Sequence, residues 1–445
     1  MTRITPLPHA SIPSPNDRAV LGWLLYDAGN SAYATTVAVG VLPAFFAGVI
    51  VGPTGIELFG HTVSATSLWG AAVGFAALML FCLAPILGAL ADRTHTKKRF
   101  LMAFCLLGVA STLGLSRCGP GDVGIALTLF VAAQIGFNGG NAFYDAFLPH
   151  IASQNELDIV SGKGFAWGYI GGGVQFGLAL GLIAGHDALG LTMTEAAGWA
   201  MASAGLWWLA FASGTFFLLP EPDKRTAPHE SRCTSSLIRQ EVAQALRHGR
   251  RIMADPTLRR FIIAFFFFND GVQTTISMAT IYGKEELGLS NQTLMITLLI
   301  IQFVAFVGAM LFGRLGARIG TIRALSLTLV IWLAVAGYAA VLSTSTQYII
   351  LGMVVGLVLG GSQSLARSLY AALIPQTESA GYFGFFSVFN KFSAILGPFA
   401  FALIRQVTGS SRPAVLVLFV FFLLGLFFLR RIKSETLRPT THPHS

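Results

Sequence analysis

The sequence predicts an all-α integral membrane protein with twelve transmembrane helices in two six-helix bundles. Three observations support this prediction: an apolar composition, twelve long apolar segments, and short patterns that occur once in each half of the chain. Hydrophobic residues make up 54% of the 445 residues, and charged residues make up only 11%. Soluble domains carry about 25% charged residues, so most of this chain is expected to lie in lipid.

The apolar segments are long enough to cross a bilayer, which takes about 20 residues in a helix that rises about 1.5 Å per residue. In the first half they lie near residues 19–48, 66–91, 100–116, 123–149, 164–186 and 198–219. In the second half they lie near residues 260–283, 292–313, 322–342, 347–373, 382–404 and 413–431. The predicted organisation is an N-terminal bundle over 1–219, a linker over 220–258, and a C-terminal bundle with a tail over 259–445.

The two halves repeat the same short patterns. Residues 141–149 read NAFYDAFLP, and residues 367–375 read RSLYAALIP. Residues 26–31 (YDAGNS) match residues 269–274 (NDGVQT) in the same way. Two tandem halves that are both buried in the membrane are typical of a transporter whose site lies between them.

The basic residues predict the topology. The net charge is +9, and of the 29 Lys and Arg residues about 23 fall in the N-terminus, the even-numbered connections and the C-terminal tail. The opposite side carries about 4 of them. Since cytoplasmic loops carry the excess of Lys and Arg, both termini are predicted to be cytoplasmic. Basic residues clustered between spans do not form a nucleic-acid-binding surface, so no nucleic-acid partner is expected.

The sequence gives no indication of an enzyme. Its four cysteines are scattered without a C-x-x-C pair, so neither a metal site nor a disulfide framework is expected. The motifs H-E-x-x-H and G-x-S-x-G are absent from the sequence. We therefore expect no catalytic residues, no metal and no cofactor. The expected protein is a monomer whose partners are a small-molecule substrate and the lipid bilayer.

Four segments resemble a known family. Residues 88–99 (GALADRTHTKKR) resemble the signature loop of the major facilitator superfamily, and a degraded copy occurs at residues 313–323. Residues 26–33, 161–172 and 383–392 together resemble the vacuole-effluxer-like family within it. The resemblance implies the major facilitator fold, alternating access, and a central cavity lined by helices 1, 4, 7 and 10. The family includes yeast relatives regarded as vacuolar amino-acid effluxers. Because this chain is short and shows no targeting extension, a bacterial inner membrane is the expected location.

The loop at residues 88–99 is a candidate gate. Asp92 follows the second predicted helix and precedes Arg93. An acid at this point can pair with a base or with a helix N-terminus, and so hold the ends of the two bundles together in one state. The alternative is membrane anchoring by basic residues beside a tight glycine turn. The candidate gating residues are Gly88, Asp92, Arg93 and, in the second copy, Arg318. That copy has Ala317 in place of Asp92, so its latch should be weaker.

Five ionisable residues fall inside predicted spans: Asp27, Asp145, Asp270, Arg367 and Lys391. A charge in the middle of a bilayer costs about 2.5–3.5 kcal/mol even on the lenient insertion scale, so each should face protein or water. The depths of Asp270 and Lys391 in their helices would allow them to pair within the second bundle. Proton coupling through a buried carboxyl group is a hypothesis that follows from this placement.

Polar residues form stripes on the helices that carry these charges. On the fourth helix, Gln134, Asn138, Asn141 and Asp145 are spaced by 4, 3 and 4 residues and therefore share a face. The first, seventh and tenth helices carry shorter stripes of the same kind; on the seventh the members are Asp270, Gln273, Thr274 and Ser277. The candidate substrate- and proton-binding residues are Asp27, Asn30, Asn138, Asn141, Asp145, Asp270, Gln273, Gln363, Arg367 and Lys391.

The charges suggest a zwitterionic solute such as an amino acid. Its amine would approach Asp27 or Asp145, and its carboxylate would approach Arg367, whose planar guanidinium suits a bidentate contact. The alternative for Asp145 and Arg367 is a salt bridge between the bundles that closes the cytoplasmic side. A second alternative function is an exporter of lipid or hydrophobic compounds on the same fold. The phenylalanine run at residues 265–268 is expected to face lipid.

Overall fold

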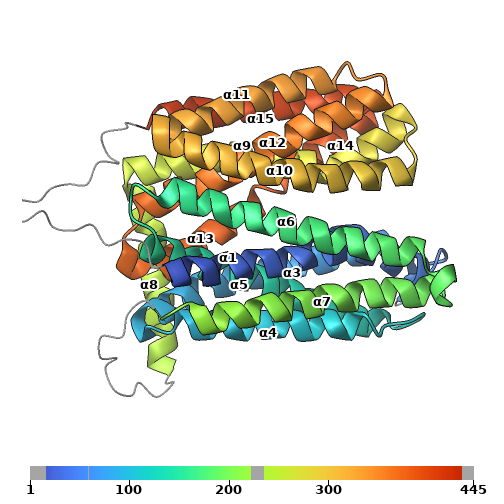
Figure 1. The fold of residues 1–445 in the computed structure, drawn as a ribbon, viewed down its shortest axis with the longest axis horizontal. Helices are drawn as coiled ribbons and strands as arrows, with labels where there is room; N and C mark the ends of the chain where they lie inside the picture. Colours follow the sequence, from blue (N-terminus) through green and yellow to red (C-terminus); the bar gives the residue numbers. More distant parts are fainter. Residues whose placement is uncertain (1–16, 59, 222–234, 433–445) are drawn as a thin grey trace, which may run out of the picture.

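The computed structural model describes residues 17–58, 60–221 and 235–432, and these contain twelve helices long and apolar enough to cross a membrane. They form two groups that lie side by side, with most of the first half of the chain on one side and most of the second half on the other (Figure 1). The helix α13 (Ser379–Phe392) of the second half lies against α3 (Ala65–Thr94) and α5 (Val123–Ile151) of the first. The predicted twelve-helix membrane fold is confirmed.

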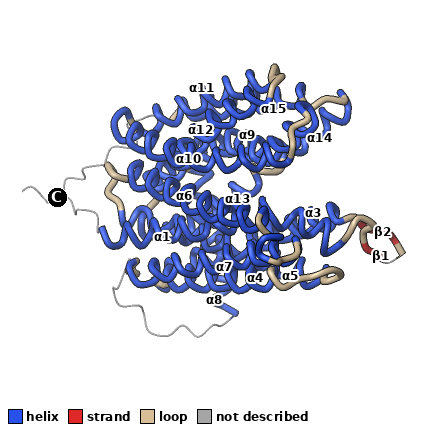
Figure 2. Tube along the Cα trace, turned by 45° about the vertical axis from the view of Figure 1, so that its right-hand side comes forward, coloured by secondary structure: helices blue, strands red, loops and turns tan. Residues whose placement is uncertain are grey.

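The first half begins with a long first span and ends with α7. Its elements are α1 (Asp17–Ala32), η1 (Tyr33–Val41), α2 (Leu42–Phe45), η2 (Phe46–Val51), β1 (Ile56–Leu58), β2 (His61–Val63), α3 (Ala65–Thr94), α4 (Lys97–Leu115), α5 (Val123–Ile151), α6 (Leu157–Ala184), η3 (Asp187–Leu189) and α7 (Met193–Leu218). The short hairpin of β1 and β2 departs from the all-α expectation, and it projects beyond the end of α3 (Figure 2).

The second half follows the linker helix α8. Its elements are α8 (Ser235–Ala254), α9 (Pro256–Leu287), α10 (Asn291–Ile319), α11 (Thr321–Ala339), α12 (Ser345–Leu373), η4 (Gln376–Glu378), α13 (Ser379–Phe392), α14 (Leu396–Thr408) and α15 (Arg412–Arg430). Below, the terminal end is the end of the molecule where α1 begins and α15 ends, and the far end is the opposite one.

Polar first turns explain why some helices begin earlier than predicted. The prediction placed the start of the sixth span at residue 198, whereas α7 begins at Met193. Thr192 accepts a hydrogen bond from the Glu195 backbone N–H, and the Glu195 carboxylate accepts one from the Thr192 backbone N–H. This reciprocal cap satisfies two N–H groups that a helix start otherwise leaves unpaired. A hydropathy pattern does not register such a turn.

The eleventh span is broken, although the sequence predicted one continuous helix over 382–404. It consists of α13 and α14, separated by three residues, Ser393–Ile395. Pro398 causes the break, because it has no N–H to donate to the carbonyl of Ala394 and its ring crowds the same position. Broken helices in transporters occur where backbone groups line a site.

The two halves pack against each other along two helix pairs, α3 with α13 and α6 with α10. Glycines allow the second pair to approach closely: a Cβ at Gly162 would lie 2.7 Å from the carbonyl oxygen of Ala309. In the described residues, polar contacts between the halves run from the terminal end to the hydrogen bond between Gln302 and Thr35, with none nearer the far end. The described protein is therefore closed at the terminal end.

Candidate functional site

A central cavity of about 490 Å³ lies between the two halves and receives side chains from both. Nine of the ten residues that the sequence suggested for substrate or proton binding line it: Asp27, Asn30, Asn138, Asn141, Asp145, Gln273, Gln363, Arg367 and Lys391. The tenth, Asp270, does not. The stripe on α5 lines the cavity with all four of its members, as its spacing requires, and Asn141 accepts a hydrogen bond from Asn30 on α1.

Arg367 is the centre of the charged group in this cavity. It comes from α12 in the second half, and its partners come from the first half. Its guanidinium donates to Asp145 Oδ1 at 3.0 Å and lies 3.7 Å from Asp27 Oδ2. It also donates to the hydroxyl and the carbonyl of Ser161, each at 3.0 Å. The geometry is therefore that of a salt bridge between the halves, which was one of the two alternatives for Asp145 and Arg367.

Aromatic rings enclose the Arg367 guanidinium. Its central carbon lies 4.0 Å from the centre of the Phe165 ring, 4.7 Å from that of Trp23 and 5.4 Å from that of Tyr144. Such contacts attract a cation to the negative face of a ring. The Tyr144 hydroxyl also donates to Asp27 Oδ2 at 3.1 Å, so the cage and the ion pairs form one unit. These aromatic residues could not be found from the sequence, because their spacing carries no signal in a chain with 36 phenylalanines.

The prediction that residues 265–268 face lipid is wrong for two of the four. Phe265 and Phe268 are buried and line the central cavity. Phe265 packs against Phe386 of α13, with ring centres 4.4 Å apart. Since a helix turns by about 100° per residue, a run of four phenylalanines cannot present a single face to lipid.

Lys391 lines the cavity from the last turn of α13, and it forms no ion pair within the part of the chain that the structure describes. The suggested pairing of Lys391 with Asp270 is not found. Asp270 is fully buried on another face of α9, where it accepts a hydrogen bond from the backbone N–H of Gly397 at 2.9 Å. Lys391 is thus a cation in the cavity wall, and no described acidic residue contacts it.

Asp92 joins the halves at the terminal end in the manner suggested for a gate. Its carboxylate accepts hydrogen bonds from the backbone N–H groups of Ala380 at 3.1 Å and Gly381 at 2.7 Å, in the first turn of α13. Lys97 lies 3.1 Å from the same carboxylate. The unpaired N–H groups of a helix N-terminus favour an anion. Gly88 lets α3 approach α13, because a Cβ there would lie only 2.3 Å from the carbonyl oxygen of Ala380.

A second acid, Asp158, also joins the two halves at the terminal end, and it was not among the predicted site residues. Asp158, in the first turn of α6, accepts hydrogen bonds from Thr321 in the first turn of α11 and from Ser368 on α12. The prediction began the fifth span at residue 164, which left Asp158 in a loop. The degraded signature copy at residues 313–323 therefore meets an acid from the first half instead of having its own.

The linker helix α8 lies across the terminal ends of both halves and contacts α3, α9 and α13 (Figure 1). Arg93 forms an ion pair at 2.8 Å with Glu241 of α8, whose side chain is buried. On the other side, Arg251 pairs with Glu378 at 2.9 Å. His248 is buried beside Glu378, and burial lowers its pKa. Arg318, the remaining candidate gating residue, is exposed and forms no ion pair with any described residue.

We expect Arg93→Gln to loosen α8 from the first half. The pair joins a buried carboxylate to a half-exposed guanidinium, so its loss should cost about 1 kcal/mol and raise amide exchange in α8 about fivefold. Hydrogen–deuterium exchange on purified protein measures this. Arg318→Gln is the matched control and should leave exchange unchanged. Equal exchange in α8 in both variants would show that the Arg93 pair does not hold the helix.

A helical membrane protein whose two halves meet around a charged cavity and close at one end is a transporter of the major facilitator class. The chain belongs to the family described as vacuole effluxer Atg22 like, whose model matches residues 16–159 and 153–440. The resemblance noted in the sequence is thereby confirmed.

Two relatives illustrate this membership. An uncharacterized MFS-type transporter, YxiO, of Bacillus subtilis is 33% identical over 421 residues, which cover 93% of this chain and 94% of the relative. The autophagy-related protein 22 of Kluyveromyces lactis is 25% identical over 362 residues, which cover 74% of this chain and 71% of that protein. The family is described as effluxer-like and the Bacillus relative as an MFS-type transporter, so the chain is a transporter and not an enzyme.

Solved structures share the fold at low sequence identity. The human organic anion transporter MFSD10 superposes with a TM-score of 0.68 at 16% identity, covering 94% of this chain and all of that protein. The transporter FucP in its outward conformation gives a TM-score of 0.67 at 14% identity, with 94% and 99% coverage. These likenesses concern the fold.

Proposed function

We propose that the protein is a secondary active transporter that moves a small zwitterionic solute, such as an amino acid or a related metabolite, by alternating access. Polar and charged side chains from both halves meet in one cavity of about 490 Å³, within the usual range of small-molecule sites. The proposal depends on which charged side chains of the cavity already have a partner. Arg367 is already paired with two carboxylates, whereas Lys391 has no anion among the described residues.

Lys391 is therefore our candidate for the solute's carboxylate, in place of Arg367. The amides of Asn30, Asn138 and Asn141 on the facing wall offer hydrogen bonds to the other end of a small solute. An amine arriving near Asp27 and Asp145 would compete with Arg367 for them, which links binding to the salt bridge between the halves. With both termini on the cytoplasmic side, the closed terminal end makes this the outward-facing conformation. A bacterial inner membrane remains the proposed location.

A thermal-shift screen of the purified protein against amino acids, small peptides and organic acids tests the substrate class. A bound solute stabilises the folded state by RT ln(1 + [L]/Kd), so a ligand of millimolar affinity becomes visible at high concentration. Stabilisation by zwitterions, with no effect of matched amines or acids alone, is the expected result. Stabilisation only by apolar compounds would favour the alternative function.

Replacing Lys391 by methionine should weaken binding of the best stabiliser from that screen by about ten- to a hundredfold. A hydrogen bond to a charged group contributes about 1.5–3 kcal/mol, and each 1.4 kcal/mol is about tenfold in affinity. Isothermal calorimetry or the concentration dependence of the thermal shift measures it. Lys284→Met, at an exposed lysine near the far end of α9, is the matched control. Unchanged affinity in Lys391→Met would remove Lys391 from the site.

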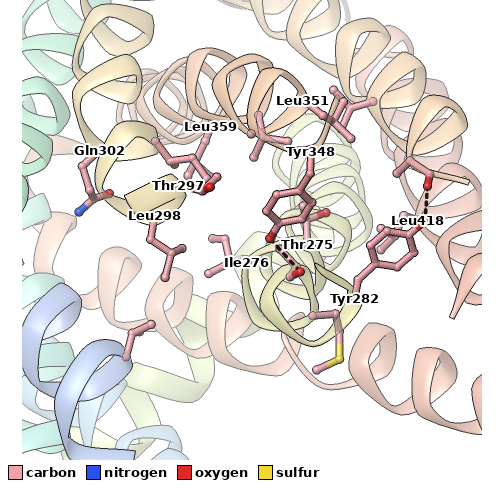
Figure 3. A pocket seen from close by; sticks show the side chains of 18 of the residues that line it. Thr275, Ile276, Tyr282, Thr297, Leu298, Gln302, Tyr348, Leu351, Leu359 and Leu418 are labelled. Carbon is pink, nitrogen blue, oxygen red and sulfur yellow. Dashed lines mark hydrogen bonds between the residues drawn. The ribbon is translucent and has the colours of Figure 1, made fainter. Parts of the chain in front are cut away.

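A second candidate function, export of lipid or hydrophobic compounds, has one observation in its favour. An apolar pocket of about 300 Å³, lined mostly by the second half, adjoins the cavity and shares Thr35, Gln302 and Gln363 with it (Figure 3). Three tyrosines line it: Tyr282 and Tyr348 donate to backbone carbonyls, and Tyr169 donates to Gln363, so the hydroxyls of all three are engaged. This function predicts transport that tolerates the loss of Arg367.

A further inference from the structure

Two consecutive residues of α9 hold the two pieces of the broken eleventh span. The amide of Asn269 donates to Asn390 Oδ1 at 2.9 Å and to the Ser393 hydroxyl at 2.6 Å, at the end of α13. Asp270 Oδ1 accepts from the backbone N–H of Gly397 at 2.9 Å, at the start of α14. The break is therefore fixed from outside the span, by one amide on one piece and one carboxyl group on the other.

The start of α14 requires this external partner. In an unbroken helix the N–H of Gly397 would bond to the carbonyl of residue 393, but here it goes to Asp270. Only glycine fits at position 397, because a Cβ would lie 1.8 Å from the Thr274 hydroxyl and 2.8 Å from Asp270 Oδ1. Asp270 and Thr274 thus converge on one point at the N-terminus of α14.

One oxygen of Asp270 is left without a partner. Asp270 and Thr274 are both fully buried, and neither Asp270 Oδ2 nor the Thr274 hydroxyl has a hydrogen-bond partner among the residues that the structure describes. No ion pair to Asp270 occurs within the described ranges. Several elements packed against α9 carry charged or titratable side chains. They are Glu241, Arg247, His248, Arg250 and Arg251 on α8, Arg314 and Arg318 on α10, Tyr348, Arg367 and Tyr370 on α12, Tyr382 and Lys391 on α13, Arg405 on α14, and Arg412 and Arg430 on α15.

A buried carboxylate without a counter-charge and with a bare oxygen is costly, whereas its protonated form is not. A proton on Oδ2 removes the charge and supplies a donor, and the nearby Thr274 hydroxyl is an unused acceptor. We propose that Asp270 is the proton-binding residue of this transporter, protonated on Oδ2 in the described conformation and deprotonated when the break in the eleventh span rearranges. This inference rests on the proposed transport function.

The position of Asp270 allows its protonation to affect the cavity. Its neighbours on α9, Asn269 and Gln273, line the cavity, so Asp270 lies directly behind the wall. Lys391 belongs to the last turn of α13, immediately before the break that Asn269 and Asp270 hold. Loss of the proton leaves a carboxylate that needs new partners. Movement of α14 or α13 to supply them would displace Lys391 and alter the solute site.

The test uses purified protein in proteoliposomes, with a radiolabelled mixture of the common L-amino acids as the probe. Wild type should accumulate the probe when a pH gradient of one polarity is imposed, and a pH-sensitive dye should report protons moving with it. Asp270→Asn mimics the protonated form permanently. It should lose gradient-driven accumulation at least tenfold while still exchanging labelled for unlabelled probe. Ser277→Ala on the same helix is the control and should behave as wild type.

The outcomes separate this proposal from the transport function. If wild type does not exchange the probe at all, the proposed function fails. If it exchanges but moves no protons, or if Asp270→Asn still accumulates the probe, the proton site fails while transport stands. Thr274→Val provides a check that does not depend on the folding of Asp270→Asn. Without the hydroxyl acceptor, half-maximal accumulation should move to more acidic pH, and an unchanged pH profile would overturn the proposal.

Discussion

Arg367→Ala is expected to abolish transport and to lower the stability of the protein. The guanidinium is buried, and four groups of the first half depend on it: Asp145, Asp27, and the hydroxyl and carbonyl of Ser161. Removing one partner of a buried ion pair costs about 3–5 kcal/mol, because the other charge is left uncompensated. Here two carboxylates are left. We expect the substitution to destabilise the described conformation, which is closed at the terminal end, because every one of these contacts joins the two halves.

Transport in proteoliposomes and the melting temperature of the purified protein measure the two effects. Arg367→Lys keeps the charge but cannot reproduce a planar fork with several donors, so it should recover part of the stability and little of the transport. Arg405→Ala is the control for loss of an arginine: its pair with Glu285 is exposed and should contribute less than about 1 kcal/mol. Normal transport by Arg367→Ala would instead support the export of hydrophobic compounds.

Gly88→Ala is expected to shift the protein out of the described conformation. The added methyl group would meet the backbone of α13, with the carbonyl oxygen of Ala380 at 2.3 Å, so the helices themselves must separate. Overpacking of this kind costs about 1–3 kcal/mol. A cost of that size, confined to one of two states, changes their ratio by about 5- to 150-fold. The terminal end should open and the far end should close.

Spin labels at Met193 and Ser345, exposed positions at the far ends of α7 and α12, would report the change as a shorter distance. Gly74→Ala is a matched control on the same helix, because a Cβ there meets nothing within 4 Å. Its distance distribution should equal that of wild type. If Gly88→Ala also gives the wild-type distribution, the contact between α3 and α13 does not limit opening.

Sequence periodicity predicted much of the cavity but not its connections. Spacing placed Gln134, Asn138, Asn141 and Asp145 on one face, and all four line the cavity, since the geometry of a straight helix fixes that relation. The same rule failed for α9. The stripe predicted on the seventh helix has four members, Asp270, Gln273, Thr274 and Ser277, yet only Gln273 lines the cavity. A stripe about 100° wide is broad enough to face two different neighbours. On α9, Gln273 faces the cavity, whereas Asp270 faces the start of α14 in the broken eleventh span.

Contacts between segments far apart in the sequence could not be predicted from residue spacing. The aromatic cage around Arg367 draws Trp23, Tyr144 and Phe165 from three helices, and no spacing along the chain relates them. Asp158 was missed because a helix start rich in polar residues resembles a loop. The break at Ser393–Ile395 had a visible cause in Pro398, but the hydropathy of residues 382–404 outweighed it.

Asp27, Asp92, Asp145 and Asp158 all belong to the first half, and the groups of the second half that they bind are a guanidinium, hydroxyls and the N–H groups of a helix start. The interface between these two related halves is thus heterologous, with these four carboxylates on one side and the groups that donate to them on the other. A symmetric dimer built from two copies of either half would set acid against acid or donor against donor. Fusion of the halves into one polypeptide, in a fixed one-to-one ratio, is what allows such complementary specialisation.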